Sequence, residues 1–215
     1  MSYVHEKAGW PNLEWNDAKL LPLLAEVRHR QGRLLGRMGG WAFGWHAALF
    51  ATERSGMRRI TVETWRPADI GMMQVVSGPM GRERVHLKAP TADRLEREVA
   101  AFLDWFEAGH GIDPVLKAGR SHFWFVTLHP FDDGNGRINR AMDDMALARA
   151  GGTMERFYSM STEIEAEKKQ YYLNREQSQK GGMDITPWFE WFLGCFGPAT
   201  QAGHLRYVTS TNATA

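Results

Sequence analysis

The sequence is 215 residues long, with 43% hydrophobic and 24% charged residues and a net charge of +1. These values suit one medium-sized globular domain with a packed core. The small net charge gives no reason to expect nucleic acid or a membrane surface as a partner. No apolar run approaches the about 20 residues that span a bilayer, and the first residues lack a secretory signal, so we expect a cytoplasmic protein.

The single cysteine, Cys195, excludes an internal disulfide and a cysteine-based zinc site. Its apolar neighbours indicate a buried, inert thiol. Four histidines have no spacing typical of zinc ligands: His46, His86, His110 and His122.

The first predicted element is a helix over residues 17–38, capped by Asn16 and followed by a shorter helix at 42–51. The region that follows is rich in β-branched residues. It predicts short strands at 59–65, 73–76 and 84–87, with residues 78–81 as the turn of a hairpin between the last two.

Helical patterns dominate the remaining chain. Asp113 followed by Pro114 is a good helix start, and that helix should stop before Pro130. Thr162 and Glu165 form a capping box that predicts one helix to about residue 177. The predicted helices after the hairpin are 91–107, 114–128, 136–150, 162–177 and 186–197, followed by a frayed tail from residue 204.

The segment that carries chemistry reads His129-Pro130-Phe131-Asp132-Asp133-Gly134-Asn135-Gly136-Arg137-Ile138-Asn139-Arg140. Glycine and asparagine tolerate a positive φ, so the residues 134–136 can turn successive backbone N–H groups toward an anion. The helix that follows points its N-terminus at the same place, and Arg137 and Arg140 lie on one face of it. Together these features predict a polyphosphate site.

Asp133 and His129 complete this site. A carboxylate beside a phosphate would repel it unless a metal bridges the two, so Asp133 predicts Mg²⁺. His129 is the one group in the loop that can take up a proton near pH 7. Each part alone has an ordinary structural explanation as a turn, a cap or a solvated face. Their order within twelve residues favours phosphoryl or nucleotidyl transfer.

The segment resembles the signature of the Fic family, His-Pro-Phe-x-x-Gly-Asn-Gly-Arg-x-x-Arg, at every fixed position. The resemblance extends over about residues 45–196, and residues 10–17 resemble the start of a helical extension on some bacterial Fic proteins. It implies a mainly α fold, namely a Fic-type helical core with a small β-hairpin flap. We expect a shortened N-terminal extension at 1–40, the Fic core at 41–197 and a C-terminal tail at 198–215.

This resemblance implies a protein adenylyltransferase that moves AMP from Mg-ATP to a Ser, Thr or Tyr hydroxyl, with pyrophosphate leaving. His129 would deprotonate the hydroxyl, and Asp133 would bind the Mg²⁺ that bridges the α- and β-phosphates. The implied nucleotide contacts are Gly134, Asn135 and Gly136 to phosphate oxygens, Arg137 to the β-phosphate, Arg140 to the γ-phosphate, and Tyr172 at the adenine pocket.

The resemblance also names partners. In the flap, an extended target segment would pair by strand addition with Arg84, Val85, His86 and Leu87. Expected partners are ATP and a hydroxyl of a target protein or of the chain itself. The sequence leaves open whether the chain forms a homodimer.

Two departures from the family pattern concern regulation and length. The inhibitory motif Ser/Thr-x-x-x-Glu-Gly/Asn, whose Glu pairs with the second motif arginine, is missing before the core, as though a helical segment were cut out at residues 39–40. Its nearest match, Ser161 to Glu165, is followed by Ala166 and lies at an ordinary helix start. Relatives often continue further beyond the core. Arg140 is therefore expected to be free and transfer to be constitutive.

Two alternative functions remain open. One is the same fold with UTP or a phosphate-bearing metabolite as donor, or with AMP removal, against which the missing inhibitory Glu argues. The other is a nucleotide- or partner-binding module without turnover. The missing helices favour this module, whereas the intact His129 and Asp133 argue against it.

Overall fold

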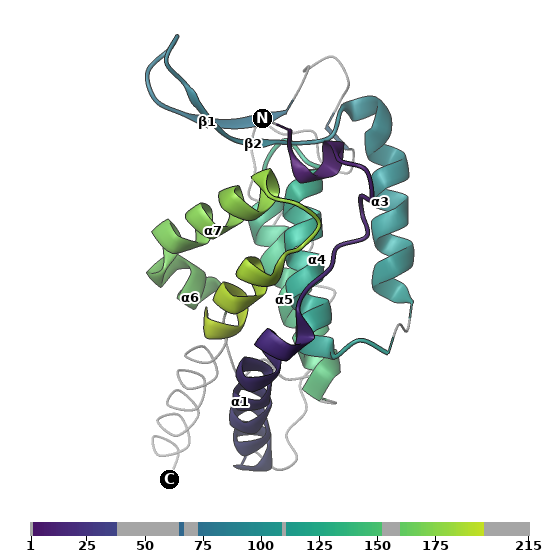
Figure 1. Cartoon of the computed structure of the whole chain (residues 1–215), viewed down its shortest axis with the longest axis vertical. Helices are drawn as coiled ribbons and strands as arrows, with labels where there is room; N and C mark the ends of the chain where they lie inside the picture. Colours follow the sequence, from purple (N-terminus) through teal and green to yellow (C-terminus); the bar gives the residue numbers. More distant parts are fainter. Residues whose placement is uncertain (1, 38–64, 67–72, 109–110, 152–159, 196–215) are drawn as a thin grey trace, which may run out of the picture.

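A computed structural model describes residues 2–37, 65–66, 73–108, 111–151 and 160–195. Within these ranges the chain is mainly helical, with one two-stranded antiparallel sheet at one end (Figure 1). The expected mainly α fold with a small β-hairpin is confirmed. The predicted helix at 42–51, nearly all of the strand at 59–65 and the tail from 204 lie outside the described residues.

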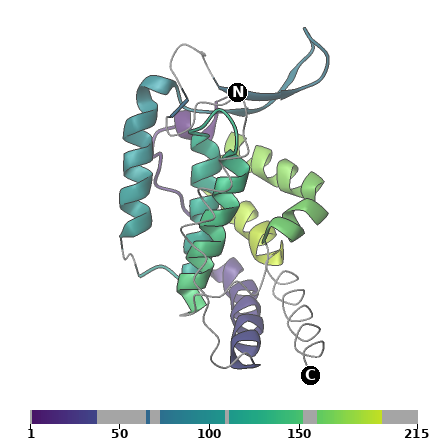
Figure 2. The ribbon, with the colours of Figure 1, turned by 180° about the vertical axis from the view of Figure 1, so that it is seen from behind.

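Two helices, α4 (Pro114–Leu128) and α5 (Asn135–Gly151), form the centre of the fold. On one side lies α3 (Ala92–Glu107), and on the other lie α6 (Met160–Ala166) and α7 (Lys168–Lys180), as both views show (Figures 1 and 2). Both central helices lie within one residue of their predicted bounds. No helix among those described is both long and apolar enough to cross a membrane.

Helix α4 is the most buried element because it is surrounded by other helices. Asp113 caps it as predicted, since its side chain accepts a hydrogen bond of 2.8 Å from the Val115 N–H. Both Phe123 and Trp124 are almost completely buried. The ring of Phe102 on α3 meets Trp124 edge-on at 5.6 Å, which fixes α3 against α4.

The N-terminal segment packs between α3 and α4. After the short 3₁₀ helix η1 (Val4–Glu6), Trp10 donates a hydrogen bond of 2.8 Å to Glu98 on α3. The backbone of Glu14 then pairs with Met183 and Ile185, and the chain enters α1 (Asp17–Arg37). This segment therefore ties the start of the chain to the loop after α7.

The predicted single helix at 162–177 is wrong. Thr162 lies inside α6 rather than at its start, and α6 and α7 are separated at Glu167. A Thr followed by Glu three residues later also occurs within helices, so this pattern alone does not fix a boundary. Beyond α7, residues 186–195 are helical and complete the core with Trp188 and Phe192. Cys195 ends this stretch as a buried thiol whose pKa burial raises to about 12.

The flap is the antiparallel pair β1 (Gln74–Ser77) and β2 (Arg84–Lys88), with a bulge between Val75 and Val76. Gly78 begins the turn with a φ of +107°, and a Cβ there would lie 2.9 Å from the Arg82 carbonyl oxygen. Only glycine fits this position without a shift of backbone. The predicted hairpin is therefore confirmed.

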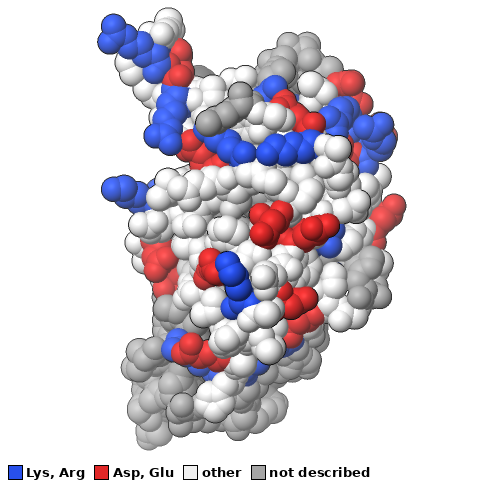
Figure 3. Space-filling model, in the orientation of Figure 1, with Lys and Arg blue, Asp and Glu red and all other residues white. Residues whose placement is uncertain are grey.

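Charged side chains of both signs share the face shown in Figure 3, with Lys and Arg most frequent near the hairpin end. The flap and the motif loop lie at this same end of the molecule (Figure 1).

The packing around α4 gives a test of the core. A Cβ added to Gly119 would lie 2.7 Å from a ring carbon of Phe189 and 3.0 Å from one of Phe192. We expect Gly119→Ala to lower the free energy of unfolding by about 1–3 kcal/mol, because both packed rings must shift. Urea unfolding measures the change.

Gly194→Ala is the matched control, because Gly194 is also helical but has no other atom within 4 Å of an added Cβ. It should be neutral or slightly stabilising, since alanine favours helix more than glycine does. Equal effects of the two substitutions would contradict the packing described here.

Candidate active site

His129 lies at the C-terminal end of α4, where it adopts a left-handed conformation with φ +47° and ψ +58°. Its N–H still donates to the Phe125 carbonyl at 3.0 Å, and Pro130 prevents the helix from continuing. A left-handed conformation costs a non-glycine residue about 1–2 kcal/mol and therefore needs support from its surroundings.

Arg66 supplies that support. Its Nε donates to the His129 carbonyl at 3.0 Å, and its backbone N–H donates to the Pro130 carbonyl at 2.9 Å. A further hydrogen bond joins its Nη2 to the carbonyl of Pro90. The side chain is buried, and burial lowers the pKa of its guanidinium. Arg66 therefore fixes the backbone on which His129 is carried.

The His129 imidazole lies in an environment that disfavours its charged form. Burial, and next the positive charge of Arg175, lower its pKa from 6.5 to about 4. Its Nδ1 atom is buried and has no hydrogen-bond partner in the described parts of the chain. The ring is therefore neutral near pH 7 and able to accept a proton.

The loop after His129 is closed by Asn135. Its Nδ2 donates to the Phe131 carbonyl at 2.6 Å, and its Oδ1 accepts from the Phe131 N–H at 2.9 Å. The side chain is only 2% exposed, so these two bonds occupy it. The backbone N–H of Asn135 is a donor for a phosphate contact that these side-chain bonds do not use.

The start of α5 has backbone donors that no hydrogen bond within the helix uses. Gly134 turns the chain with a φ of +82°, and the first helical hydrogen bond runs from the Ile138 N–H to the Gly134 carbonyl at 2.9 Å. The preceding N–H groups of the helix have no intrahelical acceptor, so they can bind an anion. Gly136 lets Arg140 lie close, since a Cβ there would be 3.2 Å from its Nη1.

Asp133 and Arg137 lie at the solvent side of this site. The Asp133 side chain is 63% exposed and lies 3.4 Å from Arg137 Nη2. No cluster of three or more metal-ligating residues occurs within the described ranges. A lone exposed carboxylate beside an anion site still fits Mg²⁺, which is commonly held by one or two carboxylates together with substrate phosphates and water.

Arg140, which we expected to lack a glutamate partner, is bonded to a hydroxyl. Its Nε donates to the Ser161 hydroxyl on α6 at 3.2 Å, and no carboxylate pairs with it in the part of the chain that the structure describes. Glu165, the last residue of the nearest match to the inhibitory motif, instead pairs with Lys168 at 3.0 Å. This match therefore places no carboxylate on Arg140.

Tyr172 lies on α7 and is 45% exposed, so its ring is accessible, as a residue of a nucleotide pocket must be. Its neighbour Tyr171 is buried, with its hydroxyl 3.1 Å from His122 Nε2. His122 Nδ1 in turn lies 2.5 Å from Asp143 on α5. This buried chain of polar groups joins α5, α4 and α7, and it explains His122 without a metal.

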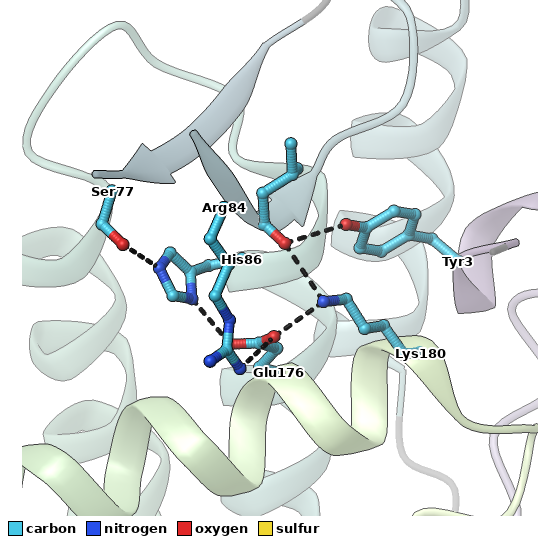
Figure 4. Close-up of polar contacts among 7 residues, drawn as sticks. Tyr3, Ser77, Arg84, His86, Glu176 and Lys180 are labelled. Carbon is cyan, nitrogen blue, oxygen red and sulfur yellow. Dashed lines mark hydrogen bonds and ion pairs between the residues drawn. The ribbon is translucent and has the colours of Figure 1, made fainter. Parts of the chain in front are cut away.

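The flap is tied to α7 by Glu176, as Figure 4 shows. This carboxylate lies 2.9 Å from Arg84 Nη2, 2.6 Å from His86 Nδ1 and 2.7 Å from Lys180 Nζ. Burial alone would raise the Glu176 pKa, but the hydrogen bonds from Lys180, His86 and Arg84 outweigh it and lower the pKa to about 2. Glu176 is therefore ionised and holds the flap at neutral pH.

The predicted docking strand lies in β2, but parts of it are already engaged. The Val85 carbonyl accepts a hydrogen bond from Lys180 Nζ at 3.1 Å and a longer one from the Tyr3 hydroxyl at 3.5 Å (Figure 4). Leu87 is completely buried, whereas Arg84 is largely exposed.

Sequence reasoning missed three residues of this site. Arg66, Arg175 and Glu176 act through contacts with residues distant in the sequence, and no motif surrounds them. The motif residues from His129 to Arg140 are brought together at the junction of α4 and α5, while Tyr172 lies on α7 and the predicted docking residues lie in β2.

Comparisons with known proteins agree with this geometry. The sequence model of the Fic/DOC family matches residues 41–147, and a domain of unknown function, DUF4172, matches residues 3–51. The chain is 32% identical over 124 residues to the protein adenylyltransferase Fic of Nematostella vectensis, covering 57% of this chain and 26% of that protein. It is 36% identical over 113 residues to the protein adenylyltransferase fic-1 of Caenorhabditis briggsae, covering 52% of this chain and 20% of that protein.

A solved structure shares the fold. The crystal structure of a Fic family protein from Desulfovibrio desulfuricans superposes with a TM-score of 0.56 at 27% identity, covering 89% of this chain and 55% of the other. The chain thus spans about a quarter or less of the two curated relatives and about half of this solved chain.

The surroundings of His129 predict an unusual titration. We expect its imidazole to stay neutral down to about pH 5, because its pKa is lowered from 6.5 to about 4. Ring resonances followed by NMR against pH, assigned by their loss in His129→Ala, measure this directly. A midpoint near 6.5 would contradict the described environment.

The lowered pKa of His129 also predicts how the stability of the fold depends on pH. The unfolded chain protonates His129 near pH 6.5, whereas the folded chain does so only near pH 4, so lowering the pH between these values favours unfolding. The loss of stability over this window should be smaller in His129→Ala.

Proposed function

We propose, because this chain belongs to the Fic/DOC family, that it is a protein adenylyltransferase which moves AMP from Mg-ATP to a hydroxyl of a target protein or of itself. The relatives named protein adenylyltransferase support this type of reaction. The observation that carries the proposal is a neutral histidine joined by a closed loop to the anion-binding start of a helix.

Each part of the loop has a role in this proposal. Backbone N–H groups at Asn135 and Gly136 hold phosphate oxygens, and Arg137 and Arg140 neutralise the β- and γ-phosphates. Asp133 would hold Mg²⁺, which when bound neutralises phosphate charge and orients the α- and β-phosphates.

The base acts on the acceptor. His129 removes the proton from the target hydroxyl as its oxygen attacks the α-phosphorus, and the bond to the bridging oxygen of the leaving pyrophosphate breaks. The transferred proton stays on the imidazole until it passes to solvent. The fixed loop supplies positioning, which is the main need of such a reaction.

The flap supplies the docking strand in this proposal. An extended target segment pairing with Arg84–Leu87 would need the Val85 carbonyl, which Lys180 and Tyr3 occupy. We therefore propose that docking exchanges these side-chain contacts for backbone hydrogen bonds of the target.

Labelled ATP with Mg²⁺ tests the proposal, with label sought on the chain itself and on added lysate proteins. We expect labelling without an activator, since no described carboxylate pairs with Arg140. His129→Ala should lower the transfer rate about 10²–10⁴-fold, because the base is lost, while ATP affinity stays nearly the same.

His29→Ala, on the exposed surface of α1, is the control and should label at the wild-type rate. Transfer by His129→Ala at the wild-type rate would refute the role of His129. ATP binding by the wild-type chain with no label anywhere would favour the binding module, and label only from another nucleotide would favour another donor.

Asp133→Ala tests the metal. We expect the maximal transfer rate in saturating Mg²⁺ to fall at least about a hundredfold, because the carboxylate that would hold the ion is gone. Mg²⁺ titrations of both proteins, with Asp104→Ala on the exposed face of α3 as control, measure it. An unchanged metal dependence would move the metal site elsewhere.

A further inference from the structure

Arg175 is a buried cation on α7 without an anionic partner. The residue is only 5% exposed, and its Nε atom has no hydrogen-bond partner among the described residues. Its guanidinium lies over the rings of Tyr172 and Tyr171, at 4.9 Å and 5.5 Å from their centroids. No ion pair joins it to a carboxylate in the described ranges, whereas the carboxylate of its neighbour Glu176 pairs with the flap.

The helix geometry places Arg175 at the end of α4. Tyr171, Arg175 and Gln179 follow each other at intervals of four residues, so they share one face of α7. Tyr171 contacts His122 at 3.1 Å, and Gln179 Nε2 donates to the Thr127 hydroxyl at 2.9 Å. Arg175 lies between these two contacts, one turn of α7 before the residue that contacts Thr127 in the last turn of α4, and its positive charge acts on His129.

Two other arginines, the buried Arg66 and the half-buried Arg120, donate to backbone carbonyls, although Arg66 Nη1 and Arg120 Nε also have no partner among the described residues. Arg66 donates to the carbonyls of His129 and Pro90. Arg120 donates to the Pro11 carbonyl at 3.2 Å and stacks on Trp105 at 4.6 Å. Arg175 has the rings and a side-chain contact with the Tyr171 hydroxyl, but it donates to no carbonyl or carboxylate among the described residues. Because a buried cation is costly unless it is paired, an acceptor supplied by a ligand would explain its position.

We propose that Arg175 is a nucleotide-binding residue whose guanidinium donates to an oxygen of the phosphate that is transferred beside His129. This inference rests on the proposed function, which places that phosphate at His129. A guanidinium makes strong, charge-assisted hydrogen bonds to phosphate, and here it would also stabilise the charge that develops on the phosphate during attack. Together with burial, the positive charge of Arg175 keeps His129 unprotonated near neutral pH, the form that can accept a proton.

Binding measurements test this inference without requiring turnover. The probes are ATP, AMP and adenosine, measured by calorimetry with Mg²⁺ on the wild-type chain and on Arg175→Met. We expect Arg175→Met to weaken ATP and AMP binding by about 10- to 100-fold and adenosine binding by less than about twofold, because only the first two carry phosphate. The affinities of Arg175→Lys for ATP and AMP should lie between those of the wild type and of Arg175→Met, since lysine keeps the charge but lacks the several donors of a guanidinium.

Arg120→Met is the matched control, because it removes a half-buried, ring-stacked guanidinium far along α4 from His129. It should lower the melting temperature and leave affinities for ATP and AMP unchanged. Arg175→Met should melt at or above the wild-type temperature in the absence of nucleotide, because it removes an unpaired buried charge.

Several results would overturn the inference. One is an unchanged affinity of Arg175→Met for AMP. Another is an equal loss of affinity for adenosine, which would indicate a contact with the base or ribose. A third is that the wild-type chain binds no nucleotide. A lower melting temperature with unchanged affinities would make Arg175 structural. If the wild-type chain binds nucleotide but transfers nothing, the proposed function fails while the comparison of Arg175→Met with wild type still decides the inference.

Discussion

The site depends on the way in which Arg66 binds the end of α4. Helix ends leave carbonyl groups without partners, and a buried end must find them elsewhere. Here one arginine takes the carbonyls of His129 and Pro130 through its side chain and its backbone. This contact holds His129 in a left-handed conformation, and the loop closed by Asn135 begins from that fixed point. His129 and the N-terminal end of α5 are therefore parts of one turn that is held by hydrogen bonds.

Local features of this turn could be predicted from the sequence, because each depends on neighbours along the chain. Asp113 and Pro114 mark a helix start, Pro130 marks an end, and Gly78 marks a tight turn. Arg66 and Glu176 could not be predicted, since their partners lie 63 and 92 positions away and their own surroundings carry no pattern. The break at Glu167 was missed for the opposite reason: the pattern of Thr162 and Glu165 is local but also occurs inside helices.

Helix α7 connects three parts of the molecule. In one turn of α7, Tyr171 forms a hydrogen bond with His122 in the core. His122 in turn forms a hydrogen bond with Asp143 on α5. The next turn brings Arg175 to the end of α4, and its neighbour Glu176 holds the flap. The positions of the flap, of α5 and of the end of α4 therefore all depend on one helix, α7. A displacement of α7 would alter all three at once.

The contact of Lys180 and Tyr3 with the Val85 carbonyl has a consequence for the behaviour of the protein in concentrated solution. A two-stranded hairpin has backbone groups along its outer edges that can pair with a strand of any other chain, which is a common route to aggregation. A lysine ammonium on that carbonyl removes one acceptor from β2 and places a positive charge where a second hairpin would have to approach. The lysine therefore hinders the pairing of β2 with unspecific partners.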